Sequence, residues 1–383
     1  MIRSFSFFLL AASLLGSFAS LHGAILLSPL ATFGGGDGYI APGEVSYLGT
    51  GSLERGLAYN PTTGNLILVS RVSGTTQNIK VLDGATGADL GTLNNTGISG
   101  GTFAANKVSV GTDGAIYVAN LASFTAGVRT PFKIYRYESE AAGLLAGPTV
   151  AFSTTAQGPR LGDSFDVIGG GATITAVTGQ GNNSANVPPL PSGNAYEVFT
   201  SPDGGLTLTQ QSIVIPTNPP ALGDFRLGIT FTDSSTSVLG TQGTAVDSAR
   251  LTNYDPTSGA GTLLGSLTLT TSGERIFDYA VVGGTPLLAT LETTTSTVRI
   301  YDFTDPLLPV LQATGNLLPG ASLANTISGG QLAFGAITGN TATLYALNTS
   351  NGIQAFQVTI PEPSSALLLG LAGAGMIARR RRR

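Results

Sequence analysis

The sequence predicts an all-β fold, a β-propeller of six four-stranded blades, with seven as the alternative blade count. Short apolar runs alternate with turns rich in Gly, Asp and Asn, and no segment of the body keeps a period of 3.6 residues. The runs also recur at spacings of 51, 57, 62, 50 and 55 residues. These spacings separate the starting positions Leu57, Val108, Phe165, Leu227, Phe277 and Leu332. A unit of this size cannot bury both faces alone, so the units must stack around an axis.

The first unit shows the strand and turn pattern most clearly. Strands are expected up to Tyr59, over 65–70, over 78–83 and over 88–93, with turns at 60–64 and 84–87. The second unit repeats this pattern over Val108–Asn120, with Asp113-Gly114 as a tight turn and 132–137 as the third strand. These two units resemble the blades of NHL-type and related bacterial propellers.

An internal repeat supports the same architecture. Ser52–Tyr59 and Ser272–Tyr279 are identical at four of eight positions and lie 220 residues apart, which is four units. The segment Ile25–Leu48 is expected to add an outer strand to the last blade and close the ring, because closure removes exposed strand edges. The competing architecture is a pair of β-sandwiches divided near 188–191 or 219–220, and the regular spacing favours the propeller. Residues 180–191 and 216–220 are then surface loops.

The body of the chain is acidic and lacks the side chains used in much of enzyme catalysis. There is no Cys, and the one His is His22, which excludes Ser-His-Asp and Cys-His catalysis and zinc sites of the His/Cys type elsewhere in the chain. Without Arg3 and the five C-terminal arginines, Lys plus Arg falls from 18 to 12; without Glu362, Asp plus Glu falls from 22 to 21. The resulting charge of −9 argues against nucleic acid as a partner.

The two ends of the chain carry the pattern of targeting signals. Arg3, the apolar run 5–15 and small residues near Ala19 and Ala24 predict an N-terminal signal peptide. At the other end a Pro-Glu-Pro turn precedes the uncharged run 364–378 and an arginine block. At ~1.5 Å per helical residue this run reaches about 22 Å, short of the ~30 Å hydrocarbon core. The residues of this C-terminal pattern are Pro361, Glu362, Pro363, Arg379, Arg380, Arg381, Arg382 and Arg383.

This C-terminal pattern closely resembles the PEP-CTERM sorting signal of Gram-negative bacteria with an exosortase, with Ile360 where Val is usual. Together with the N-terminal signal and the repeats, this predicts three parts of the chain. They are a signal peptide with a signal helix (1–24), a propeller body (25–359) and a sorting signal with a short transmembrane helix (360–383). The resemblance also implies the Sec translocon and exosortase as partners and transient membrane insertion through 364–378. The expected destination is the cell surface or an extracellular matrix, where extracellular polysaccharide is a further expected partner.

Charged residues gather just before the predicted inner strands, and these strands line the axis of a propeller. We therefore expect a polar funnel at one axial mouth that binds a carbohydrate, a peptide or a cation. The alternative is solvated strand ends or ion pairs between blades. The predicted ligand-binding residues are Glu54, Arg55, Arg160, Asp163, Asp166, Asp224, Arg226, Glu274, Arg275 and Asp278, with Asn106 and Lys107 at the same positions of the repeat.

No cofactor is expected. Calcium is the one metal that the residue types permit, but the acidic residues at 83, 113, 203 and 302–305 are explained by turn formation. We therefore predict an exported structural or ligand-binding propeller without catalysis. The alternative is a secreted hydrolase or lyase that acts on polysaccharide through carboxylate pairs such as Asp163 with Asp166 or Glu54 with Asp278. A third hypothesis is an adhesin that binds proteins through loops 180–220.

Overall fold

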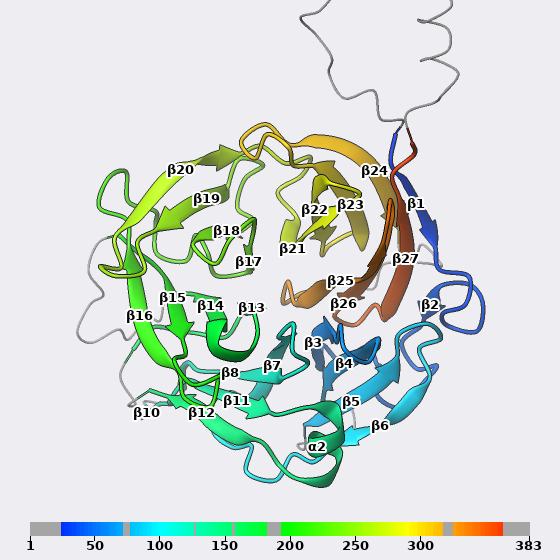
Figure 1. The fold of residues 1–383 in the computed structure, drawn as a ribbon, viewed down its shortest axis with the longest axis horizontal. Helices are drawn as coiled ribbons and strands as arrows, with labels where there is room; N and C mark the ends of the chain where they lie inside the picture. Colours follow the sequence, from blue (N-terminus) through cyan, green and yellow to red (C-terminus); the bar gives the residue numbers. More distant parts are fainter. Residues whose placement is uncertain are drawn as a thin grey trace, which may run out of the picture.

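The computed structural model describes residues 24–71, 77–125, 128–154, 158–181, 193–316 and 325–362. Six sheets are arranged in a ring around a central axis, as Figure 1 shows. The β-propeller predicted from the sequence is therefore confirmed, with six blades rather than seven. The alternative of two β-sandwiches is wrong.

Each blade is an antiparallel sheet whose strands are numbered outward from the axis, apart from the outermost strand of blade 6. Blade 1 consists of β3 Glu54–Tyr59, β4 Asn65–Ser70, β5 Asn78–Asp83 and β6 Asp89–Leu93. Blade 2 consists of β7 Phe103–Val110, β8 Ile116–Leu121, β11 Lys133–Tyr137 and β12 Thr149–Ser153. Blade 3 consists of β13 Asp166–Ile168, β14 Thr175–Gly179, β15 Asn194–Thr200 and β16 Thr209–Val214. Blade 4 consists of β17 Gly228–Phe231, β18 Ser237–Thr241, β19 Ala249–Tyr254 and β20 Gly261–Leu267. Blade 5 consists of β21 Glu274–Val282, β22 Thr285–Glu292, β23 Thr297–Asp302 and β24 Val310–Asn316. Blade 6 contains β25 Gly330–Thr338, β26 Thr341–Asn348, β27 Ile353–Thr359, β1 Leu26–Pro29 and the short β2 Tyr39–Ile40.

The N-terminal strand closes the ring, as predicted. β1 pairs antiparallel with β27, and Leu26 lies opposite Thr359. The two ends of the described chain therefore leave the ring side by side at its outer edge, between blades 5 and 6 (Figure 1). The last blade thus takes its outermost strand from the start of the body, and this strand covers the outer edge of β27.

Among the described residues, the hydrophobic core is divided into six clusters, one between each pair of neighbouring blades. Strands such as β4, with the sequence Asn-Leu-Ile-Leu-Val-Ser, are buried on both faces because each face packs on a different neighbour. This explains why the sequence shows continuous apolar runs where a half-exposed strand would alternate. The inner strands contact one another in the order β3, β7, β13, β17, β21, β25 and back to β3.

Turn chemistry explains how the strands are joined. In the predicted turn after β3, the Asn60 side chain accepts a hydrogen bond from the Thr62 N–H at 3.0 Å, and Gly64 adopts a φ of 78°. The short helix α2 Glu140–Leu145 was not predicted; the Ser139 side chain caps its first turn. Glu140 accepts hydrogen bonds from the side-chain amides of Asn60 and Asn65, which fixes α2 against blade 1.

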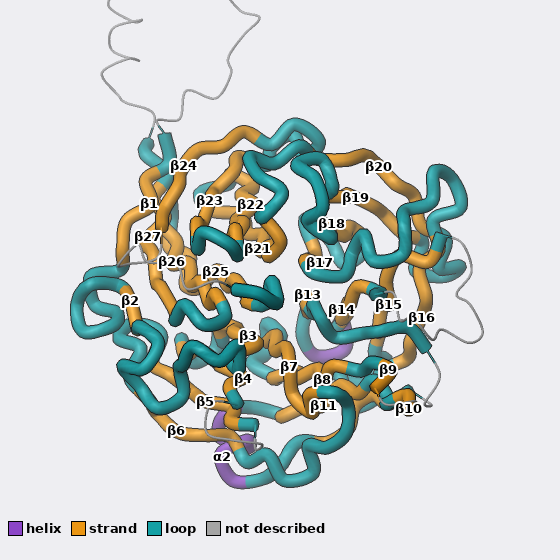
Figure 2. Tube along the Cα trace, turned by 180° about the vertical axis from the view of Figure 1, so that it is seen from behind, coloured by secondary structure: helices purple, strands orange, loops and turns teal. Residues whose placement is uncertain are grey.

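Helical structure is sparse, as Figure 2 shows. No helix within the described ranges is long and apolar enough to cross a membrane. A hairpin of β9 Phe124–Thr125 and β10 Val128–Arg129 extends from blade 2. The predicted signal helix, the predicted C-terminal membrane helix and most of the 180–191 loop lie outside the described residues.

Candidate functional site: the propeller axis

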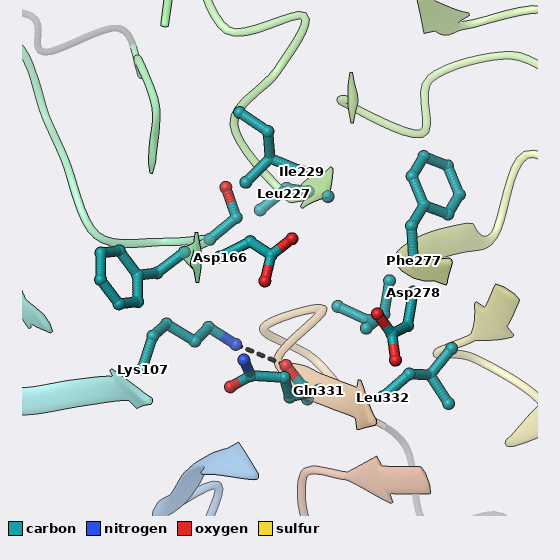
Figure 3. Close-up of a pocket in the computed structure, with 13 residues that line it drawn as sticks. Lys107, Asp166, Leu227, Ile229, Phe277, Asp278, Gln331 and Leu332 are labelled. Carbon is teal, nitrogen blue, oxygen red and sulfur yellow. Dashed lines mark hydrogen bonds between the residues drawn. The ribbon is translucent and has the colours of Figure 1, made fainter. Parts of the chain in front are cut away.

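A narrow cavity of about 30 Å³ lies on the axis of the propeller. Its lining comes from the inner strands of five blades and includes Lys107, Asp166, Asp278 and Gln331. Figure 3 shows the carboxylates of Asp166 and Asp278 reaching this cavity from opposite sides. We call this space the axial cavity.

Asp166 and Asp278 directly follow equivalent starting positions of the repeat, Phe165 and Phe277. Each of the two carboxyl groups accepts a hydrogen bond from the next blade, Asp166 from Phe231 and Asp278 from Phe334. Asp166 accepts hydrogen bonds from the backbone N–H groups of Val167 (2.7 Å) and Phe231 (2.9 Å) and from the hydroxyls of Ser109 and Thr230. Burial nevertheless raises the pKa of Asp166. Its lone pairs are occupied within the propeller, so this carboxylate has little capacity left for a ligand.

The carboxyl group of Asp278 is less fully bonded. It accepts hydrogen bonds from the N–H groups of Tyr279 (2.9 Å) and Phe334 (2.5 Å). Burial, together with the nearby charge of Asp166, raises the pKa of Asp278 to about 8. Asp278 is therefore mostly protonated at neutral pH.

Lys107 and Gln331 link blades 1, 2 and 6 across the axis. The Lys107 ammonium donates to the carbonyl of Arg55 at 2.9 Å and to that of Gly330. Gln331 accepts from the Leu57 N–H at 3.1 Å and donates to the Val108 carbonyl at 2.7 Å. Burial and the charge of Arg55 lower the pKa of Lys107 to about 7. Gln331 directly precedes Leu332, as Lys107 precedes Val108, but sequence reasoning missed it because it is uncharged.

A wider depression of about 410 Å³ opens where the inner strands end. It shares Asp166, Asp278 and Gln331 with the axial cavity, and its sides carry Tyr59 and Tyr279. None of the predicted site residues other than Asp166 and Asp278 lines it.

The opposite mouth, where the inner strands begin, gathers several of the predicted residues. Arg160 contacts the Asp163 carboxylate through two hydrogen bonds of 2.5 and 2.7 Å, and Arg226 contacts it at 2.8 Å. Burial alone would raise the pKa of Asp163, but hydrogen bonds and charges from Arg160 and Arg226 hold it below its usual value. Arg55 lies within electrostatic reach of Asp163 and Arg160.

Arg71 joins this group, although it was not predicted as a site residue. The guanidinium groups of Arg55 and Arg71 lie 4.5 and 3.7 Å from the centre of the Phe103 ring. Burial, followed by repulsion from Arg71, lowers the pKa of Arg55 to about 10. Arg71 follows β4 rather than preceding an inner strand. It lies near the mouth because blades 1 and 2 pack so that its guanidinium group contacts Phe103.

Glu54 and Glu274 point into the blades rather than toward a mouth. Each is 1% exposed. Glu54 accepts from the Gly49 N–H at 2.5 Å, and Glu274 accepts from the Tyr301 hydroxyl at 2.9 Å and the Thr271 N–H at 2.9 Å. The structure thus separates these two carboxylates from the other predicted residues.

The reason is a β-bulge shared by the two copies of the internal repeat. The register shifts between Glu54 and Gly56 in β3 and between Glu274 and Ile276 in β21. The extra residue is an arginine in both strands, Arg55 and Arg275. The bulge turns each glutamate into the blade and each arginine toward the mouth.

The remaining predicted residues have partners at the periphery of this mouth. Asp224 lies 3.9 Å from the Arg250 guanidinium. Arg275 donates to the Ser328 hydroxyl. The side-chain amide of Asn106 donates to the Gly162 carbonyl at 2.5 Å. Whether these residues take part in ligand binding stays a prediction.

Metal ligands do not cluster in the described part of the chain. No group of three or more His, Cys, Asp or Glu there could hold a metal ion. The acidic turn residues instead accept hydrogen bonds from nearby backbone N–H groups at 2.8 to 3.2 Å, and these residues are Asp83, Asp113, Asp203, Asp302 and Asp305.

The fold and the C-terminus together define a class of protein, a six-bladed β-propeller that carries a sorting motif. Residues 359–383 match the PEP-CTERM protein-sorting motif. This motif indicates export and sorting to the cell surface by an exosortase. A search of curated proteins found no match to the chain.

Several solved structures have a similar fold. A DUF4623 family protein from Bacteroides eggerthii is 14% identical with a TM-score of 0.59, over 89% of this chain and 77% of that one. A gluconolactonase from Xanthomonas campestris is 13% identical with a TM-score of 0.50, over 90% and 94% of the two chains. A calcium-binding regucalcin from Agrobacterium tumefaciens is 13% identical with a TM-score of 0.49, over 80% and 90%. At these identities the similarity concerns the fold alone.

Proposed function

We propose that this protein is a non-catalytic binding propeller that an exosortase releases from the inner membrane and that stays at the cell surface or in the exopolysaccharide matrix of a Gram-negative bacterium. One observation carries the sorting part of this proposal. The sorting motif starts at Thr359, which is also the last residue of β27. The body thus ends where the signal begins, and removal of the signal leaves all six blades intact.

The proposed division of the chain has its C-terminal boundary at this junction. Residues 1–24 are the signal peptide that the Sec translocon reads, 25–359 are the delivered body, and 360–383 hold the chain transiently in the membrane through 364–378. Pro361, Glu362 and Pro363 are the recognition turn, and Arg379 to Arg383 keep the C-terminus in the cytoplasm.

The hydrogen bonding of Asp166 argues against a catalytic role for this carboxylate. Asp166 already accepts four hydrogen bonds from the propeller, whereas a catalytic carboxylate must be able to reach its substrate.

Sorting is tested in the source bacterium by replacing Pro361, Glu362 and Pro363 with alanine. The expected result is an uncut chain retained in the inner membrane, and deletion of the exosortase should give the same product. A matched control replaces Pro306, Leu307 and Leu308 of a surface loop with alanine and should leave sorting unchanged. Normal cleavage of the tail variant would contradict the proposal.

Hydrolysis is the second candidate, because Asp166 and Asp278 line one cavity and Asp278 keeps its proton near neutral pH. One solved structure of similar fold is also a gluconolactonase. The test is release of reducing ends from the matrix polysaccharide and ring opening of gluconolactone. Turnover that disappears in Asp278→Asn and persists in Asp305→Asn would favour the enzyme over the binding module.

A further inference from the structure

The basic residues of this acidic chain are concentrated at one end of the axis. Twelve Lys and Arg lie between residues 24 and 362, since Arg3 and five C-terminal arginines account for the other six of 18. Six of these twelve surround the mouth where the inner strands begin or line its floor. We call this group the basic mouth, and it consists of Arg55, Arg71, Lys107, Arg160, Arg226 and Arg275.

Little negative charge balances this group. Asp163 is the acidic side chain that pairs with Arg160 and Arg226. Glu54 lies close to Arg55, but it faces the blade and is bonded to the backbone N–H groups of Gly49 and Ser350. Glu274 is directed in the same way toward Tyr301 and Arg299. Asp224, at the periphery, lies 3.9 Å from Arg250, a cation outside the group. Apart from Lys107, whose pKa burial lowers to about 7, the mouth keeps five arginines against Asp163 and Glu54, so it is positive on a body that is otherwise negative.

Some donors of the basic mouth also lack acceptors. Within the described residues, the buried Nε–H groups of Arg55, Arg71 and Arg275 have no hydrogen-bond partner. Arg55 and Arg71 are held together over the Phe103 ring despite their mutual repulsion. Two guanidinium groups that are kept close to each other despite their repulsion suit an oxyanion, because arginine binds carboxylate in a bidentate manner.

We propose that the basic mouth binds the carboxylate groups of a uronic acid-containing extracellular polysaccharide. This inference rests on the proposed binding role of the propeller and names its ligand class. The guanidinium groups of Arg55 and Arg71, both over the Phe103 ring, and that of Arg160 nearby suit carboxylates that are spaced along a sugar chain. Nucleic acid would place a charge every ~1.7 Å and would need an extended basic face, whereas the rest of this body is acidic.

The ligand class is tested by calorimetry on the purified body with four probes. These are trigalacturonate, the neutral trisaccharide maltotriose, inorganic sulfate and a single-stranded DNA 12-mer. Trigalacturonate should bind, more weakly as salt is added, and maltotriose should not. If sulfate bound as tightly as trigalacturonate, the mouth would be a site for small anions. If DNA bound more tightly, it would be a site for nucleic acid. Either result would overturn the proposal, and so would no binding of trigalacturonate.

The residues are tested with two variants that each remove two cations stacked near aromatic rings. Arg55→Gln with Arg71→Gln should weaken trigalacturonate binding at least about tenfold. Lys80→Gln with Lys133→Gln removes cations that lie near Tyr47 and Tyr135, away from the mouth, and should change binding less than about twofold. Equal effects of the two variants would overturn the assignment.

Asp163→Asn gives a test that does not depend on losing affinity. It removes the acidic group of the basic mouth, so trigalacturonate should bind several-fold tighter even though the protein becomes less stable. A purely structural ion-pair cluster predicts lower stability with no gain in affinity, and that result would overturn the proposal. Failure of these binding tests leaves the sorting proposal intact, because sorting is measured by cleavage in cells.

Discussion

The carboxylate of Asp278 accepts a hydrogen bond of 2.5 Å from the backbone N–H of Phe334, which joins the inner strand of blade 5 to that of blade 6. The same carboxyl group accepts from the Tyr279 N–H at 2.9 Å. Within the described chain no basic side chain lies within ion-pair distance of it. A carboxyl group that is buried in this way stabilises the ring mainly as a neutral acid.

Asp278 should make stability depend on pH. Burial raises the pKa of Asp278 to about 8, so between pH ~4 and 8 the folded state holds a proton that the unfolded chain has released. Its contribution is complete below pH ~4 and is lost as the pH rises toward 8. Relative to Asp278→Asn, the wild-type free energy of unfolding should fall by on the order of a few kcal/mol over this range in urea titrations. The turn variant Asp305→Asn should follow the wild type, and parallel curves for wild type and Asp278→Asn would refute the prediction.

Lys107 should make the free energy of unfolding rise with pH at higher pH, opposite to the effect of Asp278. Because burial lowers the pKa of Lys107 to about 7, the unfolded chain binds a proton that the folded state lacks between pH ~7 and 10.5. Stability should therefore rise with pH in this window, and Lys107→Met should abolish the rise. The variant should also lose about 1–3 kcal/mol, because the carbonyls of Arg55 and Gly330 lose their donor. Lys133→Met, a more exposed lysine, is the control, and an unchanged pH profile in Lys107→Met would count against the assignment.

Glu274 is expected to affect stability rather than ligand binding. It accepts hydrogen bonds from the Tyr301 hydroxyl and the Thr271 N–H, and it lies 3.5 Å from Arg299. Glu274→Gln should cost about 1–3 kcal/mol in chemical denaturation and leave trigalacturonate affinity unchanged. The exposed Glu138→Gln should change neither quantity. Weaker binding at unchanged stability would instead place Glu274 in the ligand site.

Ring closure can be measured with a disulfide, because the natural chain has no Cys. Ser28 lies opposite Gln357 across the closing strand pair, and Thr343 lies opposite the same Gln357 within blade 6. Joining positions 28 and 357 closes a loop that spans nearly the whole body and should stabilise by up to about 5 kcal/mol; joining 343 and 357 should give about 3 kcal/mol. Oxidised and reduced melting curves of the two double-cysteine variants provide the measurement. A larger gain from the short loop would indicate that β1 is not a stable part of the ring.

The blades were largely predictable because their signals are local. Turn residues such as Asn60 and Gly64, and apolar runs such as 65–70, specify each strand without reference to the rest of the chain. The short helix α2 was missed because it depends on one cap and on contacts of Glu140 with a turn 75 to 80 residues away.

The site was predictable only in part. Asp166, Asp278, Glu54 and Glu274 were all predicted as charges at the openings of the inner strands. Asp166 and Asp278 do line the axial cavity, whereas Glu54 and Glu274 do not. The bulges at Arg55 and Arg275 reverse the direction of those glutamates, and no local pattern in the sequence identifies a bulge. Arg71 was missed because it reaches the mouth through its contact with Phe103 of the next blade.

The pairing of β1 with β27 also bears on the order of events during export. β1 is near the beginning of the body and β27 is its last strand, so the ring cannot close until both are on the same side of the membrane. A chain arrested part-way would expose an unpaired edge and an open core, which are targets for proteases. Under the proposed sorting route, the ring therefore closes only after the whole body has crossed the membrane.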